Sequence, residues 1–232
     1  RSLDVTTMVL NGLINTRILA ACRDLHLPAV GMSGVDAGLI HASKRPPVVM
    51  HEEAEPVDFG FVGDIHDVNV DVLNKQLAMG FMPVVSPISA DASGTLLNIN
   101  ADTVASALAV ALKAEKLILA TGASGILEDL SNPHSLVSYT DLAGLKQFRD
   151  HGSLAEGMLP KISSIEAALR GGVGRVHIIS FNEPDGLLLE VFTNEGTGTL
   201  VVKSIESLTA DEHTRKEPGY TAVEVAQRKA RV

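Results

Sequence analysis

The sequence is poor in the residues that cross-link or stiffen a small fold. Among its 232 residues there is one cysteine, Cys22, and no tryptophan, and aromatic residues make up only 3%. A single cysteine excludes an internal disulfide and is typical of a reducing compartment, so we expect a cytoplasmic location. Apolar residues nevertheless reach 45%. We therefore expect a core built from aliphatic side chains.

The chain also lacks a surplus of positive charge and a long apolar run. Its formal net charge is −9, from 28 acidic and 19 basic residues, and no basic stripe is visible. Nucleic acid is therefore not expected as a partner. No uninterrupted run approaches the roughly 18 apolar residues of a membrane span, so no membrane partner is expected either. A small anionic ligand remains compatible, because backbone dipoles and one or two lysines are enough to hold it.

Several common catalytic patterns are missing from the sequence. The eight histidines show no metal-ligand spacing, and with a single cysteine we expect no zinc site and assign no metal ligand. There is no Gly-x-Ser-x-Gly elbow between a strand and a helix, no Walker motif, and no Gly-x-Gly-x-x-Gly fingerprint after a first strand. These absences argue against serine hydrolases, P-loop enzymes and dinucleotide-binding dehydrogenases.

Hydrophobic periodicity alternates between helix and strand along the chain. Helices are predicted at residues 4–26, 69–80, 102–114, 141–151 and 158–169, and strands at 28–32, 82–88, 116–120, 175–180 and 199–202. Gly12 is expected to break or kink the first helix. The alternation predicts an α/β fold, a three-layer αβα sandwich with a mostly parallel central sheet.

The most specific short motif is the segment 98–102, NINAD, where an extended stretch turns into an alanine-rich helix. Amide and carboxylate side chains at such a point bind free backbone N–H groups, so one interpretation of Asp102 is a helix cap. Ligands bind at the ends of strands in open α/β sheets, so the other interpretation is an active-site corner.

Two glycine loops are further candidates. Residues 121–125, TGASG, follow a buried strand, and their small side chains would let the backbone approach a nucleotide. A plain strand-to-helix turn is the alternative. Residues 157–161, GMLPK, place Lys161 in the first turn of a helix, where a lysine opposes the helix dipole unless an anion lies nearby. A surface lysine is the alternative there.

Several motifs in chain order together resemble the amino acid kinase family. They are the segments 57–63, VDFGFVG; 97–102, LNINAD; 157–161, GMLPK; 168–173, ALRGGV; 176–179, VHII; and 187–190, LLLE, followed by 192–199, FTNEGTGT. The resemblance covers roughly residues 1–202. Within the family it is to the branch that phosphorylates N-acetyl-L-glutamate in arginine biosynthesis.

The resemblance implies that the γ-phosphoryl group of ATP, carried with Mg²⁺, passes to the side-chain carboxylate of N-acetyl-L-glutamate to give an acyl phosphate. Lys161 would stabilise the transferring phosphoryl group, and Asp102 would organise the catalytic lysines. Asn98 and Arg1 would bind the amino-acid substrate. The residues that would line the ATP site are Gly122, Ala123, Ser124, Gly125, Ile126, Leu127, Ser153, Leu154 and Ala155.

The resemblance also implies a domain organisation. Residues 1–80 would be the remainder of an amino-acid-substrate lobe, 81–202 an ATP-binding lobe, and 203–232 a peripheral tail. A homodimer formed through helices of the first lobe is expected. The family carries a lysine-bearing strand and glycine-rich loops ahead of the position of Arg1, and the sequence shown lacks them.

Two alternatives to this function stay open. A sibling kinase acting on an aminoadipate carrier or another carboxylate is compatible with Asn98. A catalytically inactive nucleotide- or amino-acid-binding module is favoured by the missing first lysine and by Gly122, where the family usually has an aspartate.

Overall fold

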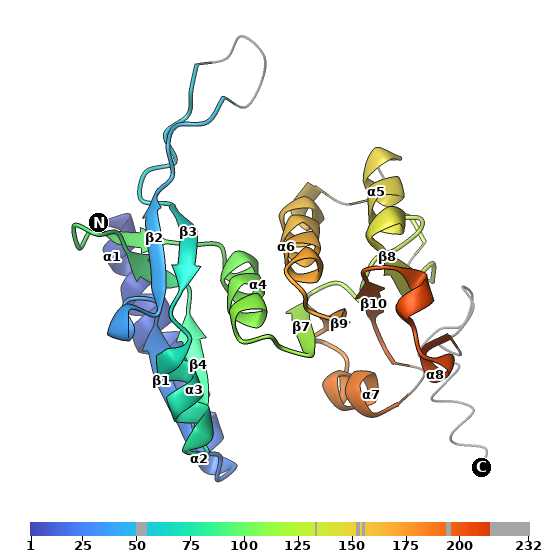
Figure 1. Cartoon of the computed structure of the whole chain (residues 1–232), viewed down its shortest axis with the longest axis horizontal. Helices are drawn as coiled ribbons and strands as arrows, with labels where there is room; N and C mark the ends of the chain where they lie inside the picture. Colours follow the sequence, from blue (N-terminus) through green and yellow to red (C-terminus); the bar gives the residue numbers. More distant parts are fainter. Residues whose placement is uncertain (50–54, 133, 152–153, 155, 194–195, 214–232) are drawn as a thin grey trace. The chain divides into compact units, whose positions relative to one another are not determined.

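The computed structural model describes residues 1–49, 55–132, 134–151, 154, 156–193 and 196–213 (Figure 1). The chain forms two compact units, Arg1–Leu112 and Lys113–Val232. Each unit is described by itself below.

The first unit begins with a long helix. It consists of α1 (Ser2–Thr7), a π-helical segment η1 (Met8–Ile14) and α2 (Asn15–Asp24). The expected break at Gly12 is absent, because the helix widens into π geometry there and continues. The helix is also long and apolar enough to cross a membrane, by length and mean composition alone, although charged residues such as Asp4 and Arg17 interrupt its apolar sequence.

This helix packs on a pair of parallel strands, β1 (Ala29–Ser33) and β4 (Met82–Ser86). Buried Asn15 donates its side-chain amide to the carbonyl oxygen of Val84 at 2.9 Å. Gly31 makes this approach possible, since a Cβ there would lie 2.0 Å from the Asn15 side-chain oxygen. The contact fixes the helix against the middle of both strands, where Gly31 and Val84 are paired.

A second sheet of the first unit has the strand order β3-β2-β5-β6. Its strands are β2 (Ile40–Lys44), β3 (Gly63–Val68), β5 (Ile88–Ala90) and β6 (Leu96–Asn98). The unit is completed by η2 (Asp36–Gly38), α3 (Asp71–Ala78) and α4 (Ala101–Ala111). Buried aliphatic side chains from the sheet and both helices form one core: Leu39, Ile40, Leu73, Leu97, Ile99 and Val104.

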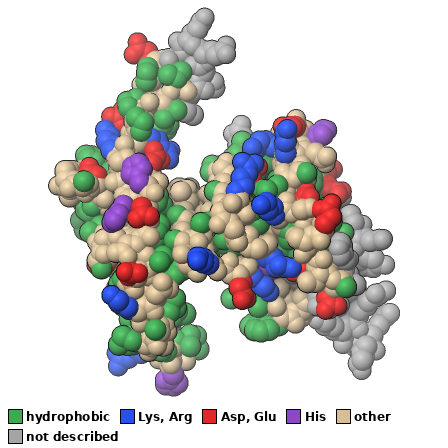
Figure 2. Space-filling view, viewed as in Figure 1, with side chains coloured by type: hydrophobic (Ala, Val, Ile, Leu, Met, Phe, Trp, Pro, Cys, Tyr) green, Lys and Arg blue, Asp and Glu red, His purple; other side chains and the backbone are tan. Residues whose placement is uncertain are grey.

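An extended arm projects from β2 and β3 and contains an antiparallel bridge between Val48 and Val57. Apolar side chains are exposed along it (Figure 2): Val48, Val49, Val57, Phe59 and Phe61. The base of the arm returns to the sheet at Val62, which forms a bridge with Asn98.

The second unit is built on one sheet with the strand order β7-β9-β10-β8. These strands are β7 (Lys116–Thr121), β8 (Tyr139–Asp141), β9 (Arg175–Ser180) and β10 (Thr199–Val202). Its helices are α5 (Leu142–Asp150), η3 (Glu156–Met158), α6 (Leu159–Arg170), α7 (Gly186–Phe192), η4 (Ile205–Ser207) and α8 (Ala210–His213). The side chains of Ile162, Ile165, Leu169, Val176, Ile178 and Leu200 are almost completely buried.

The predicted α/β class with mostly parallel pairing is confirmed. Among the pairings between named strands, β1–β4, β2–β5, β7–β9 and β8–β10 are parallel, while β2–β3, β5–β6 and β9–β10 are antiparallel. The units divide after Leu112, later than the lobe boundary predicted at residue 80, because β4 and β5 pair with strands of the first unit.

Candidate functional site

The NINAD corner lies where β6 ends and α4 begins. Asn98 is the last residue of β6, and its backbone N–H donates to the carbonyl oxygen of Phe61 at 2.8 Å. Asn100 caps α4, since its side-chain oxygen accepts from the N–H groups of Asp102 at 2.9 Å and Thr103 at 3.1 Å. The cap is therefore Asn100 and not Asp102. The Asp102 carboxylate stands half-buried in the first turn of the helix, in the region that favours an acidic group.

Arg1 occupies the start of the long helix. Its side chain is fully exposed, and its α-amino group lies 3.4 Å from the carboxylate of Asp4. The first helical turns, α1, contact β6. The fold thus brings the helix that begins at Arg1 beside the strand that ends at Asn98, although the two residues are far apart in the sequence.

The loop after β7 has an exposed half and a buried half. Gly122, Ala123 and Ser124 are exposed, whereas Gly125 and Ile126 are buried. Gly125 has φ +155°, a conformation that residues with a side chain rarely adopt. Leu127 forms an antiparallel bridge with Leu136. The sequence 121–125 is consequently a loop with a fixed inner edge and an accessible outer backbone, and not a turn leading directly into a helix.

Lys161 lies in the first turn of α6, as predicted. Pro160 precedes it within that turn, and the helix start at Met158 has no side-chain cap. Lys161 is half-buried and Leu154 is buried. Ser153 and Ala155 lie outside the described residues. Lys161 and the 122–127 loop belong to the second unit, while Arg1, Asn98 and Asp102 belong to the first.

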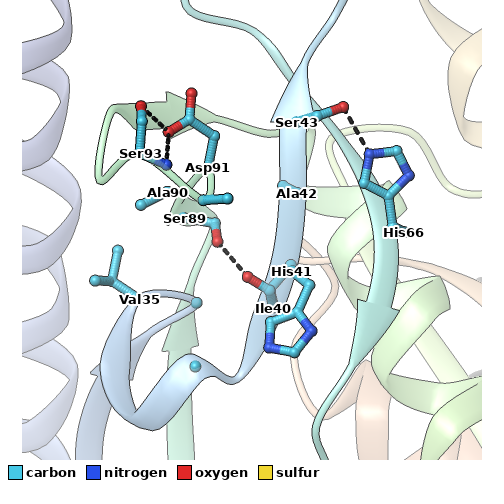
Figure 3. A pocket seen from close by; sticks show the side chains of 13 residues that line it. Val35, Ile40, His41, Ala42, Ser43, His66, Ser89, Ala90, Asp91 and Ser93 are labelled. Carbon is cyan, nitrogen blue, oxygen red and sulfur yellow. Dashed lines mark hydrogen bonds between the residues drawn. The ribbon is translucent and has the colours of Figure 1, made fainter.

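A cavity of about 820 Å³ lies elsewhere in the first unit, and none of the predicted site residues lines it (Figure 3). The imidazole of His66 is 2.6 Å from the hydroxyl of Ser43, and His41 is 3.7 Å from the carboxylate of Asp67. The Asp91 carboxylate accepts hydrogen bonds from the Ser93 hydroxyl and the Thr95 N–H of its own hairpin. These bonds lower the pKa of Asp91, and the bond from Ser93 has the larger effect. The polar groups of this cavity are thus largely paired with one another.

No group of three or more histidine, cysteine, aspartate or glutamate side chains that could hold a metal ion occurs within the part of the chain that the structure describes. Mg²⁺ commonly binds to enzymes through substrate phosphates and one or two carboxylates, without a dedicated cluster of side chains.

One buried network was not predicted, although its members lie in the segments 176–179, 187–190 and 192–199 that carry the family resemblance. It consists of Thr199, Glu190 and His177, whose side chains are almost completely buried, and Thr199 reaches the 122–127 loop directly. Buried polar side chains at the start of β10 and in β9 stand in strongly apolar surroundings. That contrast was the available signal in the sequence.

Comparison with known proteins agrees with this architecture. The model of the amino acid kinase family matches residues 1–180. The acetylglutamate kinase of Myxococcus xanthus is 48% identical over 205 residues, which cover 87% of this chain and 67% of that protein. The acetylglutamate kinase of Symbiobacterium thermophilum is 44% identical, with 87% of this chain and 69% of that protein covered.

A solved structure supports the same fold. The protein smu.665 from Streptococcus mutans UA159 superposes with a TM-score of 0.69 at 26% identity, covering 87% of this chain and 72% of that one. The chain spans about two thirds of the length of the two acetylglutamate kinases. The family match extends over most of the sequence and includes the NINAD corner, the loop after β7 and Lys161. The chain belongs to the amino acid kinase family.

Proposed function

We propose that this protein phosphorylates the side-chain carboxylate of N-acetyl-L-glutamate with ATP, a step of arginine biosynthesis. The observation that carries the proposal is the 48% identity, over 87% of the chain, to an acetylglutamate kinase. Similarity of this extent in a relative of the same family makes the same acceptor the first choice.

The amino-acid substrate is assigned to the first unit. Asn98 would donate its side-chain amide to the substrate, and the Arg1 guanidinium would bind a carboxylate, a pairing that suits its planar array of donors. Contact between α1 and β6 supports this assignment, since it sets the two elements side by side. The base of the arm adds to it, because Phe61 and Val62 meet the backbone of Asn98.

ATP is assigned to the second unit. The exposed backbone of Gly122, Ala123 and Ser124 would receive the nucleotide, with Ile126 and Leu127 forming the inner edge of the loop. Leu154 belongs to the second segment of this site, together with Ser153 and Ala155. Mg²⁺ would enter with the nucleotide and would supply positive charge to the phosphates during the transfer. We assign no residue of the chain as a metal ligand.

The reaction needs little chemistry from the protein. A carboxylate with a pKa of about 4.3 is already ionised at neutral pH, so it attacks without a general base. One carboxylate oxygen forms a bond to the γ-phosphorus while the bond to the oxygen of ADP breaks, and no proton is transferred. Catalysis then consists of positioning and charge stabilisation. Lys161 would supply positive charge to the phosphoryl group, and Asp102 would orient catalytic lysines.

A homodimer and a cytoplasmic location complete the proposal. The long first helix leaves apolar side chains exposed along its length: Val5, Met8, Val9, Leu13, Ile14 and Ile18. A second copy of the chain would cover this face. The absence of any second cysteine beside Cys22 suits a reducing compartment.

The function is tested with the protein expressed from its complete reading frame. ADP release is measured with ATP and N-acetyl-L-glutamate, and in parallel with an aminoadipate carrier as the acceptor. We expect turnover that depends on N-acetyl-L-glutamate. Turnover with the aminoadipate carrier alone would contradict the proposal in favour of the sibling kinase. Calorimetric binding of ATP without turnover on either acceptor would contradict it in favour of a binding module.

A further inference from the structure

The loop at residues 122–127 is bonded to neighbouring segments of the second unit. Its buried residue Ile126 meets Val137, whose N–H donates to the carbonyl oxygen of Ile126 at 2.9 Å. In a regular antiparallel pair, the N–H of Ile126 would return a bond to the carbonyl oxygen of Val137. Here a side chain from β10 takes the place of that bond.

That side chain is Thr199. Its hydroxyl accepts from the N–H of Ile126 at 2.9 Å and donates to the carbonyl oxygen of Val137 at 2.7 Å. The hydroxyl thus bridges two backbone groups, the N–H of Ile126 in the loop and the carbonyl of Val137 outside it. Thr199 is completely buried, so water cannot replace it. A hydroxyl oxygen is both donor and acceptor, so a single atom makes both bonds at this point.

The loop is also fitted closely around Thr199. A Cβ on Gly125 would lie 2.5 Å from the Thr199 hydroxyl and 2.7 Å from the side chain of Leu136. The positive φ of Gly125 and this contact together require glycine there. The inner edge of the loop is therefore shaped by Thr199, while its outer backbone stays accessible.

Thr199 is itself held in a fixed position. It opens β10 opposite Ile178 of β9, and a Cβ on Gly198 would lie 1.9 Å from the carbonyl oxygen of Ile178. One carboxylate oxygen of Glu190 accepts from the N–H groups of Thr197 at 2.7 Å and Gly198 at 3.1 Å. The buried carboxylate of Glu190 therefore fixes the backbone just before β10, where the strand begins to pair with β9.

A histidine completes the support. The other carboxylate oxygen of Glu190 lies 2.6 Å from Nδ1 of His177, and both side chains are buried. His177 thereby orients Glu190, which orders the segment leading to Thr199. A continuous line of short contacts runs from β9, through α7 and β10, to the loop.

We propose that Thr199 is a positioning residue for nucleotide binding: its hydroxyl fixes the 122–127 loop in the form that receives ATP. The proposal rests on the assignment of this loop to ATP in the proposed function. Thr199 touches the loop and not the nucleotide, so its loss should weaken ATP binding and leave the amino-acid site unchanged.

The test compares Thr199→Val, which keeps the shape and removes the hydroxyl, with Thr199→Ser, which restores the hydroxyl. Val202→Ala is the matched control, because Val202 is completely buried in the same strand and has its side chain in a separate apolar cluster. All variants are assayed at a temperature where thermal unfolding shows them folded. KM for ATP, KM for N-acetyl-L-glutamate and hydrogen exchange of the peptide containing Ile126 are measured.

We expect Thr199→Val to raise KM for ATP about tenfold or more, the scale set by two buried groups left without partners. KM for N-acetyl-L-glutamate should change less than about twofold, and the Ile126 peptide should exchange faster. Thr199→Ser should restore both values. Unchanged KM for ATP in Thr199→Val, or an equal rise in Val202→Ala, would overturn the inference.

Two further measurements cover the cases in which Thr199→Val does not fold or the unsubstituted protein binds no ATP. If Thr199→Val does not fold, Thr199→Cys is used, since a thiol forms weaker hydrogen bonds; its KM for ATP should lie above that of Thr199→Ser, and equal values would overturn the inference. If the unsubstituted protein binds no ATP, the proposed function fails by itself. The inference then fails as well in its nucleotide part, whereas exchange at Ile126 still decides whether Thr199 anchors the loop.

Discussion

At the scale of single residues, position within a helix separates structural from chemical roles. The side-chain oxygen of Asn100 accepts hydrogen bonds from the first N–H groups of α4, as is typical of a capping residue. Asp102 and Lys161 instead stand in the first turns of α4 and α6, where neither is needed as a cap. A lysine at the positive end of a helix costs electrostatic free energy. Its presence there is explained if a phosphoryl group binds nearby.

Lys161 provides the residue-scale prediction. Lys161→Ala should lower kcat about 100-fold or more, because a preorganised charge at the transferring phosphoryl group is lost. The melting temperature should stay nearly unchanged, since half-exposed lysines contribute little to stability. Initial rates and thermal unfolding check both parts. Lys146→Ala, at an exposed lysine of α5, is the matched control and should keep full activity. A Lys161→Ala protein that unfolds, or that retains kcat, would contradict the catalytic assignment.

The sequence was sufficient to select some of these residues and not others. Asn98 and Asp102 stand out because they lie where an extended segment turns into a helix, and Lys161 because a lysine in the first turn of a helix opposes the helix dipole. Thr199 does not stand out, since its partner Ile126 is 73 positions away and the bond exists only after β10 has joined the sheet. Which residue caps α4 depends on where the backbone becomes helical, and the sequence does not fix this point to a single residue. The cap predicted at Asp102 is therefore made by Asn100.

At the scale of elements, the tail after β10 is attached to the sheet by an ion pair. The guanidinium of Arg175, in β9, donates to both carboxylate oxygens of Glu212, in α8, with one contact at 2.7 Å. The pKa of Glu212 is lowered from its ordinary value of 4.5 to about 2. The hydrogen bond from Arg175 is the largest cause, and the bond from the N–H of Thr209 adds to it. The first part of the predicted peripheral tail, up to His213, is thus tied to the second unit.

This pair predicts a pH dependence of stability. Because folding lowers the pKa of Glu212, its contribution is complete above about pH 4.5 and is lost as the pH falls toward 2. Glu212→Gln should therefore reduce the free energy of unfolding by about 1 kcal/mol at pH 7, a value reduced by solvent screening. The difference from the unsubstituted protein should shrink between pH 4.5 and 2, as followed by urea unfolding. Glu206→Gln, at an exposed neighbour, should show no such convergence. A difference that stays constant across this range would contradict the ion pair.

Helices and apolar strands of four or more residues in the second unit were the elements that the sequence predicted best. The strands at β7, β9 and β10 and the helices α5 and α6 are found within a residue or two of their predicted bounds. The short strand β8 was not predicted, because three residues carry no periodicity and its strand form depends on pairing with β10. The π-helical segment around Gly12 was not predicted either. It arises where the helix adapts to the strands beneath it, with Asn11 and Asn15 both bonded to β4.

At the scale of the whole molecule, the exposed face of the first helix bears on assembly. Val5, Met8 and Leu13 are each about half exposed or more, and apolar surface of this kind marks an interaction site. The same helix passes the length and composition test for a membrane span. However, its other side contacts β1 and β4, with Asn15 bonded to Val84 and Cys22 buried, which suits a helix lying between a sheet and a second copy of the chain.

The proposed dimer can be tested by sedimentation. The unsubstituted protein should sediment at twice its monomer mass, and Met8→Glu should shift it toward the monomer, because a charge would be buried without a partner. Met79→Glu is the control, since Met79 is also highly exposed but lies at the end of α3. A monomeric unsubstituted protein, or one that is recovered with phosphatidylcholine vesicles instead, would contradict this assignment of the helix face.

The formation of an acyl phosphate tests the central claim most directly. The protein from the complete reading frame is incubated with ATP, Mg²⁺, N-acetyl-L-glutamate and hydroxylamine, and the hydroxamate formed from the side-chain carboxylate is measured. We predict hydroxamate in amounts equal to the ADP released, and none when N-acetyl-L-glutamate is left out. ADP release without hydroxamate, or no reaction at saturating substrates, would contradict the account.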